Sequence, residues 1–442
     1  MRLANGLSET TIRQISALKH EPAWMLQLRL RAYHQFLKMP LPKFGPTLKI
    51  NFSNICYYSS QANQPTSNWA DLPNDIKSTY DKIGLPEAEQ KYLAGLGAQY
   101  DSAIVYQNLK HEWEDLGVIF LDTDTGLKRY PELFRRYFAS VIPYNDNKFA
   151  ALNTAVWSGG SFIYVPPNVK LTIPLQAYFR INLANLGQFE RTLIIADEGS
   201  EVQYIEGCTA PLYSTASLHA AVVEVVALAG SRVRYTTIQN WSTNVLNLTT
   251  QRMHIYHDAL GEWVDGNIGS KVTMKYPAIV LLEPGARGNI LSLGIAKAGQ
   301  NQDNGAKAIH LAPYTSSTIV AKSISLNGGI CSYRGKNIFA KCASHAKTSA
   351  KCDALLMDSR SVSNTFPQNI IACSDAQVSH EATVSKISEE QLFYMMNRGI
   401  NEDEATSLIV NGFIDPIVKN LPMEYAVELN RLINLDMSGA VG

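Results

Sequence analysis

The sequence predicts a mainly β protein in which a parallel β-helix, a solenoid of stacked coils, lies between helical segments at both ends. From about Leu152 onward, short alternating apolar runs are punctuated by glycine, which is a strand pattern. The glycines are periodic: Gly199-Ser200, Gly230-Ser231 and Gly261-Glu262 follow one another at a constant interval. A fixed period of strands and turns is typical of a solenoid, because each coil buries its apolar face against the next.

The strands keep one register along these repeats. The apolar positions that recur one period apart are Val202 with Val233, Tyr204 with Tyr235, and then Val264. The interval becomes shorter between Gly261 and Gly285. A propeller of the WD or kelch type would need longer repeats, of about 40 to 50 residues. A β-sandwich with coincidental spacing stays open as the alternative.

Apolar residues at helical intervals predict helices before the solenoid. They cover Ser8–Met39 with a break at Pro22, and then Pro86–Tyr106 and Tyr130–Ser140. The stretch between about residues 40 and 78 is rich in Pro, Ser and Asn and predicts loops. We therefore expect three domains: a mostly helical N-terminal domain (1–150), the β-helix core (151–384) and a C-terminal helical domain (385–442).

The C-terminal helices are predicted by their caps. Ser388-Glu389-Glu390-Gln391 is a capping-box sequence that opens a helix over Leu392–Arg398. Asn401 caps a second helix that reaches Gly412, and a third helix follows Pro422. These helices either only protect the last coil from edge-to-edge aggregation or also dock a partner.

The charge balance excludes whole classes of partner. The chain of 442 residues has 39 basic and 39 acidic residues, so its net charge is zero. A general role on nucleic acid or on an anionic membrane needs a basic excess, and we expect neither partner. The first residues form no apolar signal core, and no stretch approaches about 18 charge-free apolar residues. We expect a cytoplasmic protein, with the plastid stroma as the alternative for a mature organellar form.

Cysteine and histidine suggest a metal site. The six cysteines form no CxxC pair, so we interpret them as free thiols or ligands; they are residues 56, 208, 331, 342, 352 and 373. Cys352 and the pair His380-Glu381 supply the three side-chain types that bind iron or zinc. The spacing between Cys352 and His380 is close to the length of one coil, so we expect them to be neighbours. The ordinary alternative is that Cys352 packs in the solenoid interior.

The chain resembles the SufB/SufD family of iron-sulfur cluster assembly scaffolds, and its SufB members in particular. The match is weak over Ser8–Leu37 and then runs from about Leu152 to Gly442. It is carried by Tyr178-Phe179-Arg180-Ile181-Asn182, Gln188-Phe189-Glu190-Arg191-Thr192, Ile205-Glu206-Gly207-Cys208, Leu218-His219-Ala220-Ala221-Val222-Val223-Glu224, Gln239-Asn240-Trp241, Ser332-Tyr333-Arg334-Gly335 and His380-Glu381-Ala382-Thr383. The resemblance implies a right-handed parallel β-helix and a scaffold, not an enzyme, that builds a nascent iron-sulfur cluster for transfer to apo-proteins.

The resemblance also implies partners. They are a SufC-type ABC ATPase docked through the C-terminal helices, a SufD-type subunit or a second copy of the chain docked through the β-helix, and the sulfur carrier of a cysteine desulfurase. The apolar residues Phe393, Met395 and Met396 suit the first of these contacts. The sequence has no Walker A pattern, so we expect ATP hydrolysis in the partner. Reduced flavin serves some family members as an electron source, but no dinucleotide fingerprint supports it here.

By the same resemblance, Cys208 accepts persulfide sulfur, and Arg180, Asn182 and Thr237 line an internal sulfur route. Arg180, Cys208 and Thr237 follow one another at nearly equal spacings of about one coil, so we expect the coils to stack them. A guanidinium next to the thiol would favour the thiolate. One route position departs from the family pattern, because Gln251 stands where a lysine is expected.

Cys352, with Glu381 and His380, is the implied site for iron or the nascent cluster, at an interface between protomers. Ser379 replaces an acidic residue that usually precedes the His-Glu pair, so at most Glu381 supplies a carboxylate there. Cys208 and Cys352 are separated by about five coils, or ~24 Å at one strand spacing per coil. We therefore expect the two thiols to be too far apart to touch.

Two other classes of function stay open. A SufD-like structural subunit would share the fold without receiving sulfur, although Cys208 and Cys352 together argue against it. A polysaccharide-active β-helix enzyme would carry a surface cluster of carboxylates or calcium-binding aspartates, which the sequence does not suggest. Cys208 has an ordinary alternative as a buried small hydrophobe. His219 is interpreted as a hydrogen-bonded core histidine.

Overall fold

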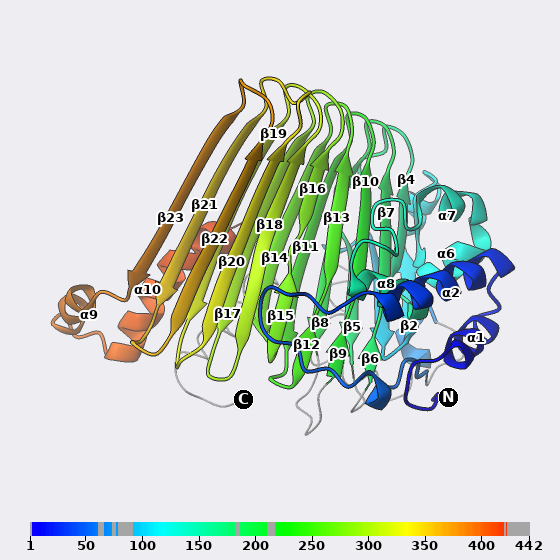
Figure 1. Ribbon diagram of the computed structural model, residues 1–442, viewed down its shortest axis with the longest axis horizontal. Coiled ribbons are helices and arrows are strands. Elements are labelled where there is room, and N and C mark those ends of the chain that lie inside the picture. Colours follow the sequence, from blue (N-terminus) through cyan, green and yellow to red (C-terminus); the bar gives the residue numbers. More distant parts are fainter. Residues whose placement is uncertain are drawn as a thin grey trace.

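The computed structural model, which describes residues 2–60, 66–72, 77, 92–181, 186–209, 217–419 and 421, is a parallel β-helix of about 7 turns with helices at both ends (Figure 1). One wall is a ten-stranded sheet in the order β2 (Ala103–Leu109), β1 (Gly95–Tyr100), β5 (Leu175–Arg180), β8 (Glu201–Thr209), β11 (Arg232–Trp241), β14 (Leu260–Gly269), β17 (Arg287–Ala296), β19 (Ser316–Ser325), β21 (Lys347–Leu356) and β23 (Gln377–Lys386). Apart from the β1–β2 hairpin, neighbouring strands of this sheet are parallel.

The second sheet has two arms that merge. One arm is β3 (Ile119–Asp122), β4 (Ser161–Val165), β7 (Arg191–Ala196), β10 (Val222–Ala227), β13 (Thr250–Ile255) and β16 (Ala278–Leu281). The other arm is β6 (Gly187–Gln188), β9 (Ser217–His219), β12 (Val245–Asn247) and β15 (Val272–Lys275). Both β15 and β16 pair with the long strand β18 (Asn301–His310), which β20 (Ile330–Phe339) and β22 (Val362–Ile371) follow. Early coils therefore have three sides and late coils have two.

The predicted register holds for one coil and then changes. Val233 pairs with Val202 and Tyr235 with Tyr204, as the spacing of the glycines predicts. In the next coil Val233 pairs with Gly261, so Gly261 lies inside β14 and the prediction that it occupies a turn is wrong. The turn position belongs to Asp258, whose φ of 52° is left-handed like the 67° of Gly230. Aspartate tolerates this conformation better than most residues, which lets a turn form without glycine.

The N-terminal helices agree only in part with the prediction. α1 (Glu9–Leu18) begins at the cap Ser8 and α2 (Ala23–Lys38) follows the break at Pro22. The described residues of this segment also form α5 (His111–Glu114), α6 (Thr123–Arg129), α7 (Pro131–Tyr137) and α8 (Lys148–Val156). The helix predicted over Pro86–Tyr106 is wrong for its described part, which forms β1 and the beginning of β2.

Tertiary pairing explains this correction. β1 pairs in parallel with β5 and thereby continues the wall of the solenoid. A Cβ at Gly95 would lie 2.8 Å from the carbonyl oxygen of Asn108, so this close hairpin needs glycine. Among the described residues before 151, three strands thus belong to the two sheets, while α1, α2 and α8 lie together at the N-terminal end of the solenoid (Figure 1).

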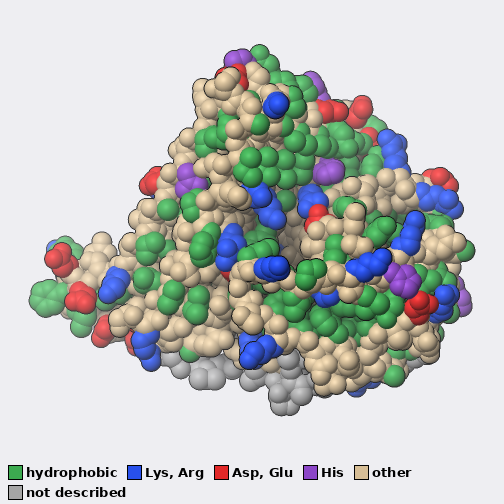
Figure 2. Space-filling view, in the orientation of Figure 1, with side chains coloured by type: hydrophobic (Ala, Val, Ile, Leu, Met, Phe, Trp, Pro, Cys, Tyr) green, Lys and Arg blue, Asp and Glu red, His purple; other side chains and the backbone are tan. Residues whose placement is uncertain are grey.

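The C-terminal caps are as predicted. Ser388 accepts a hydrogen bond from the Gln391 amide at the start of α9 (Glu389–Met396), and Asn401 caps α10 (Glu402–Val418). α10 continues past the predicted end at Gly412, because its apolar face packs on the outer face of the first sheet. The third predicted helix, after Pro422, lies outside the described residues. α9 projects from the body of the molecule, and Figure 2 shows hydrophobic side chains on this projection.

Within the part of the chain that the structure describes, no helix combines the length and apolarity needed to cross a bilayer.

Candidate functional site

Two thiols lie inside the solenoid on well-separated strands of one wall. Cys208 is on β8 and Cys352 on β21, and both belong to the same buried core as Tyr204 and Tyr235. Four strands, β11, β14, β17 and β19, separate β8 from β21. The two thiols are therefore five strand spacings apart, or ~24 Å, as the sequence predicts.

A partly polar column connects the two thiols along the inner face of this wall. Strand pairing stacks, in order, Glu206, Thr237, Asp265, Ser292, Ala321 and Cys352. Cys208 lies in the adjacent column, two residues after Glu206 and on the same face of β8. Four of the six positions in the column carry oxygen, which is unusual for the interior of a β-helix wall.

Acidic side chains surround Cys208. Its Sγ lies 3.6 Å from Glu206 Oε1, and the ligand atoms of Cys208, Glu206 and Glu190 are all within 4.8 Å of one another. All three residues are buried. Burial, and then the two carboxylates, raise the pKa of Cys208 well above its usual value. Burial and the neighbouring Glu190 raise the pKa of Glu206 to about 7.

His219 is hydrogen-bonded and buried, as predicted, but it belongs to the surroundings of Cys208. Its Nε2 contacts Glu190 Oε1, and its Nδ1 lies 2.8 Å from Asn247 Oδ1. Burial alone would lower the pKa of His219, but Glu190, Asn247 and Glu206 together outweigh burial and the pKa is raised. Glu190 lies between β6 and β7, His219 ends β9 and Asn247 ends β12, so three coils meet here.

The residues predicted to form the sulfur route are only partly brought together. Phe179, not Arg180, pairs with Cys208, so Arg180 lies on the opposite face of the wall and the predicted stacking of its guanidinium on the thiol is wrong. Thr237 pairs with Glu206 and faces the interior. Asn182 lies outside the described residues.

Gln251, which stands where the family pattern has a lysine, is a buried amide side chain. It pairs with Val223 in the second sheet, and neither its Oε1 nor its Nε2 has a hydrogen-bond partner in the described part of the chain. A cation that no sequence pattern singled out, Lys275 of β15, is buried in the interior and forms an ion pair with Asp265 of the polar column. An acidic residue inside an otherwise apolar strand, as in Tyr204–Cys208, is the signal that could have revealed Glu206.

At the other end, Cys352 has the predicted histidine as its neighbour. Cys352 Sγ and His380 Nε2 are 3.8 Å apart, although His380 pairs with Ala350, so the contact is diagonal. Glu381 pairs with Lys351 on the outer face, where their charged groups are 3.3 Å apart. The structure thus brings Cys352 and His380 together and directs Glu381 away from them. Burial raises the pKa of Cys352 to about 12.

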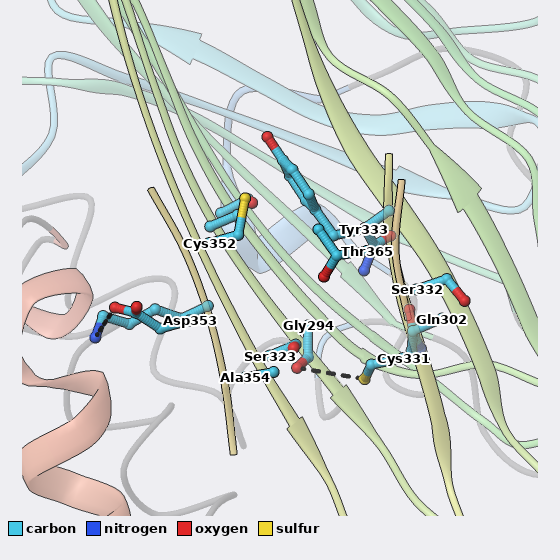
Figure 3. A pocket seen from close by; sticks show the side chains of 14 residues that line it. Gly294, Gln302, Ser323, Cys331, Ser332, Tyr333, Cys352, Asp353, Ala354 and Thr365 are labelled. Carbon is cyan, nitrogen blue, oxygen red and sulfur yellow. Dashed lines mark hydrogen bonds and ion pairs between the residues drawn. The ribbon is translucent and has the colours of Figure 1, made fainter. Parts of the chain in front are cut away.

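Cys352 borders a small cavity between the two walls. The cavity has a volume of about 20 Å³, which is room for one or two water molecules. Tyr333 and Thr365 project from the second sheet and face Cys352 across this space, while Asp353 points away (Figure 3). Cys331, from the second sheet, lines the same cavity.

Comparison with known proteins agrees with this architecture. Residues 179–413 match the family described as "SUF system FeS cluster assembly, SufBD core domain", and residues 98–177 match "SufBD protein N-terminal region". Relatives from Staphylococcus aureus (strain MRSA252) and Staphylococcus haemolyticus (strain JCSC1435), each named an iron-sulfur cluster assembly SufBD family protein, are 58% identical over 442 residues. The alignments cover 100% of this chain and 95% of each relative. The chain therefore belongs to the SufBD family of iron-sulfur cluster assembly proteins.

Proposed function

We propose that this chain is the SufB-type scaffold subunit of a SUF complex, which receives persulfide sulfur on Cys208, receives iron, and builds a nascent cluster at Cys352. The observation that carries the proposal is the partly polar inner column between the two thiols. A purely structural solenoid would fill these positions with apolar side chains, because buried polar groups cost free energy unless they are paired.

Unpaired polar atoms support a route along this column and the adjacent column of Cys208. Thr237 Oγ1 in the first, and Gln239 Nε2 and Asn267 Oδ1 in the second, are buried and have no hydrogen-bond partner among the described residues. Native interiors rarely leave such atoms without a hydrogen bond, so water or a migrating sulfur species would hydrogen-bond to them. Arg180 remains in the proposal as a residue that acts from the outer face, and Asn182 remains in it on the family resemblance alone.

The cluster end of the route requires a second chain. Clusters are commonly held by four ligands, and Cys352 with His380 supplies two. His380 Nδ1 is buried and unpartnered in the described structure, and Glu381 is exposed on the outer face. β23 is the last strand of its sheet, and edge strands are sites for pairing with another chain. A SufD-type subunit or a second copy of this chain would supply the missing ligands there.

The C-terminal helices are the proposed contact for a SufC-type ATPase. Phe393 is 67% exposed, Tyr394 59% and Met396 44%, which is far more apolar surface than capping the last coil requires. Tyr394 and Met395 also line an open groove between α9 and α10 with Leu408. An apolar helix with an adjoining groove fits helix-in-groove docking. The sulfur carrier of a cysteine desulfurase would deliver sulfur at the opposite end, near Cys208.

One observation favours the SufD-like alternative. Cys208 is buried among carboxylates that disfavour its thiolate, and Arg180 does not face it. A thiol in this state is a poor acceptor of sulfane sulfur, as a structural subunit would allow.

Sulfur loading distinguishes the two functions. The purified chain is incubated anaerobically with a cysteine desulfurase, its sulfur carrier and cysteine, and persulfide is located by mass spectrometry in wild type, Cys208→Ser and the buried-thiol control Cys56→Ser. The scaffold function predicts persulfide on Cys208 in wild type and in Cys56→Ser. Absence of persulfide from Cys208 in both proteins would support the SufD-like function.

A further inference from the structure

We propose that Glu190, Glu206 and Cys208 form a binding site for a divalent transition metal inside the solenoid, next to the sulfur acceptor. The inference rests on the proposed function only for the identity of the metal, which is ferrous iron. It assigns iron entry to the Cys208 end of the polar column and not to the Cys352 end.

The geometry fits a single ion. One oxygen from each carboxylate and Cys208 Sγ lie within 4.8 Å of one another. Ligand atoms that share one metal at about 2.0 to 2.4 Å lie no more than about 4.8 Å apart. Glu206 and Cys208 project from the same face of β8, and Glu190 reaches them from the segment that precedes β7. The site is therefore built from two coils and all its donors are buried.

A second observation, an unpaired carboxylate oxygen, supports binding of a cation. Glu190 Oε2 is buried and has no hydrogen-bond partner in the described part of the chain. Its other oxygen contacts His219 Nε2. Leaving a buried carboxylate oxygen unpaired is costly, and a cation between the two carboxylates and the thiol would remove that cost.

The orientation of Glu190 is fixed by a chain of hydrogen bonds. Asn247 Nδ2 donates to Gln239 Oε1 over 2.6 Å, which turns Asn247 Oδ1 toward His219. His219 Nδ1–H donates to that oxygen over 2.8 Å, so Nε2 is directed at Glu190. Histidines and amides that hold carboxylate ligands in this way are typical of the shell behind a metal site.

The donor set selects the class of metal. Two carboxylates and one thiolate suit Fe²⁺, Co²⁺ or Zn²⁺, whereas Ca²⁺ and Mg²⁺ prefer oxygen ligands alone. When the metal–sulfur bond forms, the Cys208 thiol loses its proton to solvent. The ion would thus hold Cys208 as the thiolate, the charge state that the sequence led us to expect from Arg180.

Cobalt spectroscopy tests the site directly. Co²⁺ is titrated anaerobically into the full chain carrying Cys352→Ser, so that the thiol at the other end of the column cannot contribute. Thiolate-to-cobalt charge-transfer absorption is recorded in this background and after adding Cys208→Ser, Glu190→Gln, Glu206→Gln or the buried-thiol control Cys56→Ser. Circular dichroism establishes that each variant is folded.

We expect stoichiometric absorption in the Cys352→Ser background and in the Cys56→Ser control. It should disappear in Cys208→Ser, and each glutamine variant should weaken cobalt binding by at least about tenfold. If Glu190→Gln fails to fold because His219 loses its partner, Glu206→Gln tests the same carboxylate requirement. Absorption that survives in Cys208→Ser, or that is absent from the background protein, would overturn the inference. Persulfide loading of Cys208 in the same preparations would show that the proposed function nevertheless stands.

Discussion

Glu224 offers a sharp test of how the N-terminal segment is held on the solenoid. Its buried carboxylate accepts hydrogen bonds from Arg191 Nε at 3.0 Å and from the backbone amides of Ala139, Val141 and Ile142 at 2.9 to 3.0 Å. These three amides belong to the connection between α7 and α8. The substitution Glu224→Gln keeps the shape of the side chain but removes its charge and turns one acceptor into a donor.

The free-energy cost of Glu224→Gln follows from the burial of the ion pair. The Arg191–Glu224 pair has no exposed side-chain surface, and removing one partner of such a pair costs about 3 to 5 kcal/mol because the other charge stays buried. The opening of the connection should become more favourable by a similar amount. Its amides would then exchange with solvent deuterium roughly 10² to 4 × 10³ times faster, at about 1.4 kcal/mol per factor of ten.

The assay is hydrogen–deuterium exchange with mass spectrometry on the peptide that spans residues 139–142. Glu262→Gln is the matched control, because Glu262 pairs with Arg234 at 3.2 Å while 23% of its own side chain is exposed. Partly exposed pairs contribute about 0 to 1 kcal/mol, so this control should leave the exchange within a few-fold of wild type. Equal exchange in the two variants, or no acceleration in Glu224→Gln, would refute the conclusion that Glu224 holds the connection between α7 and α8 on the solenoid.

Three further predictions concern pH, reactivity and docking. Burial lowers the pKa of His310 to about 4, so the unfolded state binds a proton that the folded state does not bind between about pH 6.5 and 4. The free energy of unfolding should therefore fall by about 2 kcal/mol between pH 7 and pH 5. His310→Gln should lose this part of the acid sensitivity, measured by urea unfolding. An identical pH profile for wild type and variant would contradict the prediction. Cys352, with a pKa of about 12, should be alkylated by iodoacetamide roughly 50-fold more slowly than a thiol of ordinary pKa 9.0. This factor allows for the greater nucleophilicity of the Cys352 thiolate. If Cys352 and the cysteine of a short peptide were alkylated at equal rates, the buried placement would be contradicted. Phe393→Ser should change stability by less than about 0.5 kcal/mol yet weaken binding of a SufC-type ATPase about 30-fold in calorimetry, and unchanged binding would exclude α9 as the contact.

The fold could be predicted because its main signals are local and repeated. The alternating apolar runs, the turn glycines Gly199 and Gly230 and the caps at Ser388 and Asn401 all depend on residues close in sequence. The hairpin at Gly95–Leu109 could not be predicted in the same way, since its apolar pattern fits a helix as well as a strand. Pairing of β1 with β5, which lies far along the chain, decides between the two.

The site shows how far a spacing argument can reach. Sequence spacing correctly predicted that Cys352 and His380 are neighbours. Cys352 itself pairs with Ala382, so the contact with His380 is diagonal. The same argument failed for Arg180 and Cys208, because the residue that pairs with Cys208 is Phe179. An even offset from the paired residue keeps two side chains on one face of the wall, and an odd offset places them on opposite faces. Coil lengths vary by single residues, so sequence spacing alone cannot fix the face.

Because the coils are stacked, the distance between the two thiols depends on the number of coils between them. Each coil pairs with the coils before and after it, so a whole coil between β8 and β21 can in principle be gained or lost while strand pairing is kept at both ends, provided that α10, which packs across these strands, shifts with it. Such a change would move Cys208 and Cys352 apart or together by one strand spacing of ~4.8 Å. The deletion of a single residue inside a strand would instead turn every later side chain in that strand to the other face. The distance between the two thiols is therefore open to evolution or design only in whole-coil steps.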